Sequence, residues 1–112
     1  MLAMKFQIKR GIMFIRLEGE LTNYNFSKVA EKINYLLYSQ GILVYVFNLA
    51  KVTKMDKSLF ENIQNKLTEI FLKCGSVAFC GISNKVRKRI GERYGQLFYI
   101  AKEYEVFQYI SI

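Results

Sequence analysis

The sequence predicts an α/β fold with a mixed, mostly parallel β-sheet, an antiparallel strand at one edge and about four helices packed mainly on one side. Two observations support this class. The chain opens with a hairpin pattern, and it then alternates apolar strand-like runs with helical periodicity. Strands joined through helices become parallel neighbours, whereas a hairpin adds an antiparallel one. No linker divides the chain, so we expect a single domain over residues 1–112.

The N-terminal residues predict the hairpin. Apolar and polar side chains alternate over residues 5–9, which is the period of a half-buried strand. Residues 10–11 read Arg-Gly and supply a turn, and residues 12–17 return as a second strand. The polar stretch at residues 18–20 is expected to end this strand.

A helix and a fully buried strand are expected next. Asn25 or Ser27 fits the N-cap of the helix, and Gly41 fits its end. The uninterrupted apolar run at residues 42–47 predicts a strand that is buried on both faces and extends to Leu49. The helix positions expected to face the core are Phe26, Val29, Ala30, Ile33, Leu36 and Leu37.

The second half of the chain continues the alternation of strands and helices. In order, the expected elements are a basic loop at 51–54, a helix at 57–73, a strand at 76–80, a helix at 83–94, a strand at 97–100 and a helix at 102–109. In the helix at 83–94, Val86 and Ile90 are expected to point inward. The resulting order, β-β-α-β-α-β-α-β-α, underlies the fold prediction.

Composition limits the classes of partner and location. The net charge is +8, which predicts attraction to an acidic protein face, to nucleic acid or to a membrane surface. The longest apolar run, residues 42–47, is far shorter than the roughly 20 residues of a membrane-spanning helix. The N-terminal residues show no secretory signal pattern. We therefore expect a cytoplasmic protein without membrane insertion.

Side chains suited to catalysis are scarce, and we expect a protein that is not an enzyme and needs no cofactor or metal. Histidine is absent, which removes the commonest general base and zinc ligand. Glu18 and Glu20 alternate along a strand and should point to opposite faces. Cys74 and Cys80 are expected to be reduced and at least half buried.

Three local patterns resemble the STAS domain of bacterial anti-sigma factor antagonists, also called anti-anti-sigma factors. Residues 15–21 read Ile-Arg-Leu-Glu-Gly-Glu-Leu, similar to the strand-ending R-L-x-G-E-L-D of that family. Residues 47–58 are similar to its L-D-L-S-x-V-x-x-M-D-S-S pattern, and residues 77–86 to its L-x-L-C-G-V-S-P-x-V pattern. The spacing between the patterns also fits, so the resemblance covers nearly the whole chain.

The resemblance implies a regulator of transcription in bacterial signalling that acts by protein–protein binding. Its partner would be an anti-sigma factor, which in this family can be a serine kinase that phosphorylates the antagonist and thereby weakens the complex. Position by position, the phosphoacceptor is Ser58 and the adjoining acid is Asp56. Ser58 with Glu61 three residues later also fits a capping box, so helix capping is the alternative role of this hydroxyl.

The chain departs from the family pattern at three positions. Lys57 replaces the first serine, Leu59 replaces the glycine after the phosphoacceptor, and Thr22 replaces the acid that follows Glu-Leu. The resemblance places the partner-binding surface at the helix start, with Leu59 as an exposed apolar contact, and at the loop that precedes the first helix. The expected partner-binding residues are Asp56, Lys57, Leu59, Thr22, Asn23 and Asn25.

A basic cluster leaves alternatives open. Its members are Lys85, Arg87, Lys88, Arg89 and Arg93. A solvated helix face accounts for such a cluster, and nucleic-acid binding through Lys85, Lys88 and Arg89 is the alternative. The aromatic residues expected to fill the core, and so to be unable to stack on bases, are Tyr35, Tyr38, Tyr45 and Phe79. A non-phosphorylated STAS scaffold and an accessory domain of a transport system are further alternatives.

Overall fold

The structure is a computed structural model, and it describes residues 1–91 and 95–110. Its strands are β1 (Leu2–Lys9), β2 (Ile12–Leu21), β3 (Val44–Met55), β4 (Ser76–Cys80) and β5 (Leu97–Tyr99). Its helices are α1 (Asn23–Asn34), α2 (Leu59–Leu72), α3 (Asn84–Ile90) and α4 (Val106–Tyr109). A π-helical turn, Tyr35–Ser39, extends α1, and a 3₁₀ turn, Glu103–Glu105, precedes α4. The predicted order of elements is confirmed.

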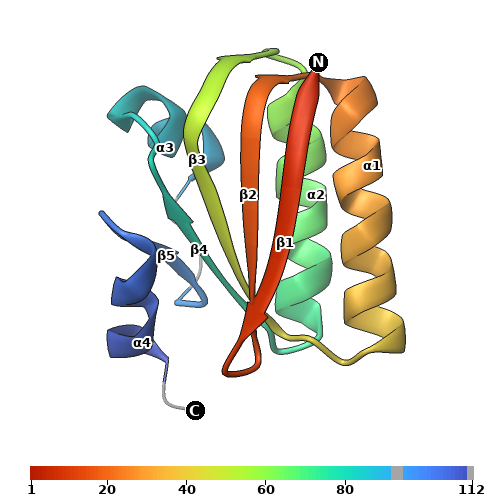
Figure 1. The fold of residues 1–112 in the computed structure, drawn as a ribbon, viewed down its shortest axis with the longest axis vertical. Helices are drawn as coiled ribbons and strands as arrows, with labels where there is room; N and C mark the ends of the chain where they lie inside the picture. Colours follow the sequence, from red (N-terminus) through yellow and green to blue (C-terminus); the bar gives the residue numbers. More distant parts are fainter. Residues whose placement is uncertain (92–94, 111–112) are drawn as a thin grey trace.

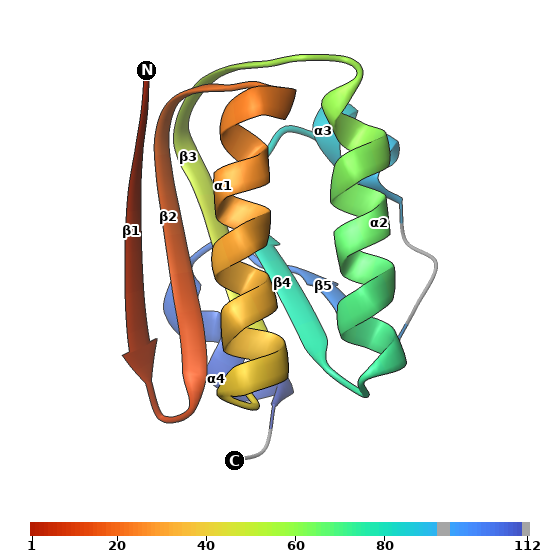
Figure 2. The same cartoon turned by 90° about the vertical axis from the view of Figure 1, so that its right-hand side faces the viewer.

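The five strands form one mixed sheet in the order β1-β2-β3-β4-β5. Only the β1–β2 pair is antiparallel, and the three other pairs are parallel. Helices α1 and α2 lie side by side on one face of the sheet, whereas α4 lies on the other (Figures 1 and 2). The predicted fold class, a mostly parallel sheet with an antiparallel edge strand and helices mainly on one side, is confirmed.

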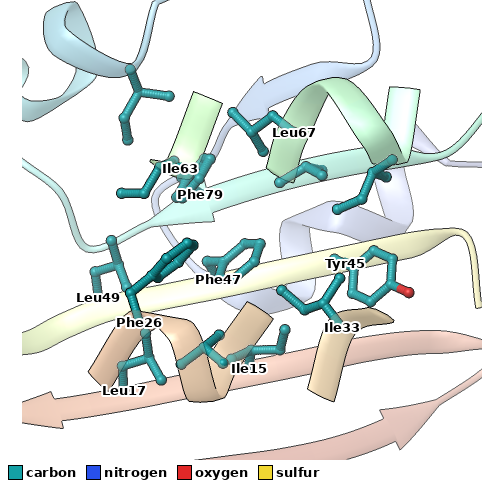
Figure 3. Packing of buried hydrophobic residues seen from close by; sticks show 14 of the residues in the cluster. Ile15, Leu17, Phe26, Ile33, Tyr45, Phe47, Leu49, Ile63, Leu67 and Phe79 are labelled. Atoms are coloured by element: carbon teal, nitrogen blue, oxygen red, sulfur yellow. The ribbon is translucent and has the colours of Figure 1, made fainter. Parts of the chain in front are cut away.

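Two hydrophobic clusters explain why the central strands are apolar without interruption. The larger cluster joins α1 and α2 to the sheet and includes Ile15, Phe47 and Phe79 (Figure 3). The smaller cluster lies on the opposite face, where Phe14 and Val46 of the sheet are buried together with Val106 of α4. Neighbouring residues of a strand point to opposite faces of the sheet. Because both faces are covered, neighbours such as Phe14 and Ile15 are both buried.

Strands β2 and β3 are longer than the sequence predicts. Residues 18–20 continue β2 to Leu21, and the expected basic loop at 51–54 is part of β3. The two strands stay paired through register shifts, with Glu18 beside Lys51 and Glu20 beside Lys54. Opposite charges in neighbouring strands favour this pairing, and the polar composition that indicated a loop instead belongs to an exposed strand extension.

The N-terminus of β1 meets this extension at Gly19. Gly19 has φ +111°, and a Cβ atom there would lie 2.3 Å from the carbonyl oxygen of Met1. Only glycine fits both the positive φ and this close approach. The glycine therefore belongs to the paired part of β2, rather than marking its end.

Several side chains are more exposed than expected. Tyr35 and Tyr38 are each 53% exposed, so the expectation that they fill the core is wrong, whereas Tyr45 and Phe79 are buried. The two exposed tyrosines belong to the turn that extends α1, where the ring of each lies within reach of a lysine ammonium group. Cys74 is also exposed, because it follows the end of α2, whereas Cys80 is buried in β4.

Candidate functional site

The site predicted from the sequence lies where β3 passes into α2. The main chain folds tightly here, because the Leu59 amide donates to the Asp56 carbonyl over 3.1 Å. The Asp56 amide donates to the Leu21 carbonyl over 3.3 Å, which ties this turn to the end of β2. Ser58 precedes the first helical residue, and its side chain is exposed. The structure therefore presents the serine at the surface, beside the start of α1.

Ser58 does not cap α2. No backbone amide of the helix donates to its side chain, so the capping-box alternative for Ser58 and Glu61 is wrong. Instead, the Asn23 side-chain amide donates to Ser58 Oγ over 2.6 Å. The Asn62 amide in turn donates to Asn23 Oδ1 over 2.9 Å. The hydroxyl oxygen thus accepts one hydrogen bond, and its own hydrogen has no acceptor in the described part of the chain.

The Asn23–Ser58–Asn62 contacts join two helix starts. Asn23 begins α1, whereas Ser58 and Asn62 belong to the start of α2. The family resemblance predicts that Asn23 lies beside Ser58, and the structure brings the two together. Asn62 is not among the predicted residues, although a spacing of four residues places its amide on the same helical face as Ser58.

Leu59 is not an exposed contact, contrary to expectation. Its side chain is 0% exposed and belongs to the larger hydrophobic cluster, as does the neighbouring Phe60. The helical periodicity explains this, because Ile63 and Leu67 continue the same buried stripe. The side chain at the family's glycine position therefore points into the core, and the surface beside Ser58 is formed by Lys57 and the asparagines.

Thr22 and Asn25 have structural roles at the start of α1. Thr22 is the N-cap, so the expectation that Asn25 or Ser27 caps this helix is wrong. The Asn25 amide donates to Thr22 Oγ1 over 3.2 Å, and the Thr22 amide donates to Asn25 Oδ1 over 2.8 Å. These reciprocal hydrogen bonds form a capping box. The expected loop at residues 22–25 is therefore mainly the first turn of α1.

The basic residues of α3 do not form a single solvated face. Arg87 lies over the Tyr99 ring at 4.4 Å, and Arg89 lies over the Phe60 ring at 4.7 Å, both measured to the ring centroid. Lys85 and Arg89 line a groove at the carboxyl ends of β3 and β4, whereas Lys88 does not. Arg93 and the predicted end of this helix at residue 94 lie outside the described residues.

The remaining reactive groups are few. Burial raises the pKa of the Cys80 thiol to about 11, so this thiol is protonated and unreactive at neutral pH. In the described ranges, no three side chains of the His, Cys, Asp or Glu type come together as metal ligands do. Across the same ranges, no helix combines the length and apolar character that crossing a bilayer requires. The arrangement is suited to presenting a hydroxyl and hydrogen-bonding amides to another molecule.

Comparisons with known proteins agree with this geometry. The family model described as STAS domain matches residues 3–108. The anti-sigma factor antagonist SpoIIAA in its unphosphorylated form aligns with a TM-score of 0.78 at 21% identity, covering 95% of this chain and 96% of that chain. The Bacillus cell fate determinant SpoIIAA in the phosphorylated form aligns with a TM-score of 0.74 at 20% identity, covering 95% and 97%.

A third solved structure is a Thermotoga maritima protein described as a proposed anti-sigma factor antagonist. It aligns with a TM-score of 0.78 at 16% identity, covering 94% of this chain and 92% of that chain. At these identities the three structural matches establish a shared fold. The shared topology extends over nearly the full length of both chains in each comparison.

Proposed function

This chain belongs to the STAS domain family, and we propose that it is an anti-sigma factor antagonist that binds its partner through the start of α2 and is switched by phosphorylation of Ser58. The proposed activity is binding in the cytoplasm. Any kinase chemistry, with its ATP, belongs to the partner. Release of a sigma factor from the bound anti-sigma factor would then regulate transcription.

One observation carries this proposal: the hydroxyl of Ser58 is exposed and is not used to cap the helix it precedes. Most serines at a helix start satisfy a backbone amide, which fixes their side chain in the fold. Here Asn23 holds the oxygen, and the hydroxyl hydrogen remains available to a base of the partner. This is the arrangement that a partner kinase needs when the γ-phosphoryl group of ATP is transferred to the oxygen and ADP leaves.

Leu59 does not oppose this role. The family has glycine after the phosphoacceptor, and a larger side chain there would hinder a close approach by the partner if it pointed outward. Because Leu59 is 0% exposed, its side chain does not lie over Ser58. Lys57 is exposed beside the hydroxyl and would partly neutralise a phosphate, which adds about 1.5 to 2 negative charges.

The switch would act on the surface and leave the fold intact. A phosphate at the N-terminal end of a helix is favoured by the helix dipole, so modification should not unfold α2. It would, however, replace a small hydrogen-bonding hydroxyl by a bulky dianion. The contact with Asn23 and the fit to a partner would change together, and affinity would fall.

The test compares Ser58→Asp with the wild type in calorimetric titration against purified anti-sigma factors from the source organism. We expect the substitution to weaken binding by about tenfold or more, equivalent to about 1.4 kcal/mol, without lowering the melting temperature. Thr68→Asp is the matched control, because it adds the same charge at an exposed position of the same helix. Equal affinities of wild type and Ser58→Asp would exclude Ser58 from the mechanism and favour a non-phosphorylated scaffold.

Phosphorylation itself has a separate readout. Incubation of the wild type with the partner and ATP should add the mass of one phosphate, and Ser58→Ala should abolish this addition. Modification that persists in Ser58→Ala would assign the phosphate to another residue.

A further inference from the structure

A groove opens beside the proposed partner surface, between the end of β3, the start of α2 and α3. Its volume is about 450 Å³, within the range of protein sites that accommodate ligands. It lies at the carboxyl ends of the parallel strands β3 and β4. The groove is lined by Leu49, Ala50, Val52, Thr53, Lys54, Met55, Lys57, Phe60, Gly81, Ile82, Ser83, Lys85, Val86 and Arg89.

One wall of the groove is held against β3 by Gly81. This glycine has φ +73°, and a Cβ atom there would lie 2.4 Å from the backbone nitrogen of Ala50. The loop that leads into α3 can approach the strand this closely only because position 81 has no side chain. The shape of the groove is therefore fixed by the backbone of two elements and does not depend on mobile surface side chains alone.

The charge of the lining is of one sign. Lys54, Lys57, Lys85 and Arg89 line the groove, and no acidic residue is among the described residues that do. Within residues 1–91 and 95–110, none of these four cations forms an ion pair; the two ion pairs there join Arg16 to Glu103 and Lys66 to Glu69. Unpaired cations around one concave surface favour an anionic occupant.

The lining is also aliphatic, which narrows the chemistry of the occupant. Val52, Met55, Ile82 and Val86 are half buried, so each leaves part of its apolar surface accessible. An occupant that carries only negative charge would leave this surface without a partner. An occupant with both carboxylates and an aliphatic side chain would satisfy both parts of the lining.

We propose that this groove binds an acidic segment of a protein partner, one that carries carboxylates and at least one aliphatic side chain. The inference rests on the proposed function, because Lys57 makes the groove continuous with the Ser58 surface that the partner would read. A partner that covers Ser58 would extend over the groove. The groove would thus supply affinity and selectivity for the partner, and Ser58 would supply the switch.

The aromatic residues nearby argue for a peptide over a nucleic acid. Binding of single strands relies on exposed aromatic rings on which bases stack. Phe60 is 9% exposed and the Arg89 guanidinium lies over its ring, while Arg87 lies over the ring of Tyr99. Phe60 is thus almost fully buried, and Tyr99 is not among the residues that line the groove, so the cations there are not accompanied by a stacking platform.

The test is a titration of the full chain, followed by the backbone amide signals in NMR spectra. The probe is a short blocked peptide of glutamate, glycine and leucine, and we expect saturable shifts at Val52, Met55, Ile82 and Val86. Replacing each glutamate of the peptide by glutamine, or each leucine by serine, should weaken its binding. An oligothymidine of matched charge is titrated in parallel.

Two lysines of α3 provide a matched pair of variants. Lys85 and Lys88 are both exposed on the same helix, but only Lys85 lines the groove. We expect Lys85→Glu to weaken peptide binding about fivefold and Lys88→Glu to change it by less than about twofold, because a charge acts most strongly on a ligand beside it. The circular dichroism spectrum and melting temperature check that both variants fold.

Three results would overturn the proposal: shifts that do not saturate, equal effects of the two lysine variants, or tighter binding of the oligothymidine at the same amides. These results are separate from the failure of the proposed function, which is an unchanged affinity of Ser58→Asp for an anti-sigma factor. The peptide titration does not involve the Ser58 hydroxyl, so either hypothesis can fail while the other stands.

Discussion

The starts of α1 and α2 lie side by side, and both are polar, but the fold uses their hydroxyl groups differently. At α1, Thr22 and Asn25 exchange hydrogen bonds in a capping box that satisfies backbone amides of the helix. At α2, Ser58 satisfies no backbone amide, and its oxygen accepts from Asn23 of the neighbouring helix start. The first hydroxyl therefore stabilises the fold, whereas the second is available for recognition.

The difference follows from how each helix start is anchored. α2 does not depend on a side-chain cap, because Leu59 and Phe60 are buried at its first positions. In addition, the Asp56 amide donates a hydrogen bond to the Leu21 carbonyl. α1 has its first buried residue only at Phe26, so its first turn relies on the capping box. Because buried neighbours already anchor the start of α2, Ser58 can leave the helix uncapped at little cost in stability.

The largest expected effect tests this anchoring by burial. Leu59→Ala should lower the free energy of unfolding by about 3 kcal/mol, because truncating a fully buried leucine loses apolar burial and leaves a cavity. Leu72→Ala, at the other end of the same helix, is the control, since Leu72 is 80% exposed and its loss should cost less than about 0.5 kcal/mol. Urea unfolding measures both. Equal losses would mean that burial does not hold the start of α2.

The next effect compares the two hydroxyls directly. Thr22→Ala should lower the free energy of unfolding by about 1 kcal/mol, the usual cost of losing an N-cap, whereas Thr22→Ser should retain most of that energy. Ser58→Ala should change stability by less than about 0.5 kcal/mol, because its hydroxyl caps nothing. A loss at Ser58 as large as that at Thr22 would contradict the proposed division of roles.

The smallest expected effect concerns a polar contact on the face of the sheet that is opposite α1 and α2. This contact stabilises the fold. Arg16 donates to both carboxylate oxygens of Glu103 over 2.8 and 2.7 Å, and Asn48 donates to the same carboxylate over 2.8 Å. These hydrogen bonds, led by that from Arg16, hold the pKa of Glu103 below its usual value of 4.5. The pair joins the turn before α4 to β2 and β3.

Because the folded pKa of Glu103 is depressed, the pair stabilises the protein fully above pH 4.5, and this contribution is lost as the pH falls through the lower folded value. Glu103→Gln should therefore lower stability at pH 7 by at most about 1 kcal/mol, since the pair is partly solvated, and by less in acid. Urea midpoints of wild type and variant at pH 7 and below 4.5 provide the measurement. A difference that stays constant with pH would show that the carboxylate charge contributes nothing.

The candidate site could be predicted in part. Local pattern predicts a helix start near Ser58, because helices follow from hydrophobic period. The expectation that Asn23 lies beside this start comes from the family resemblance. The same pattern did not distinguish a capping serine from an uncapped one, since Ser58 with Glu61 satisfies the composition of a capping box. The expectation of an exposed Leu59, which the family resemblance implies, is wrong because Leu59 belongs to the buried stripe that continues through Ile63.

The sequence alone is enough to predict the order of the elements, the mixed sheet and the buried central strands. These features follow from apolar spacing and turn residues, which act between near neighbours along the chain. It also determined the excess of positive charge and the lack of histidine.

Which polar groups contact one another depends on the three-dimensional arrangement of the elements. The contact of Asn23 with Ser58 joins residues that are 35 positions apart, and the groove combines lysines of β3, the turn after it and α3. The extension of β2 and β3 through charged residues likewise depends on each strand having the other as its partner. Such choices depend on distances across the fold, and spacing along the chain does not specify them.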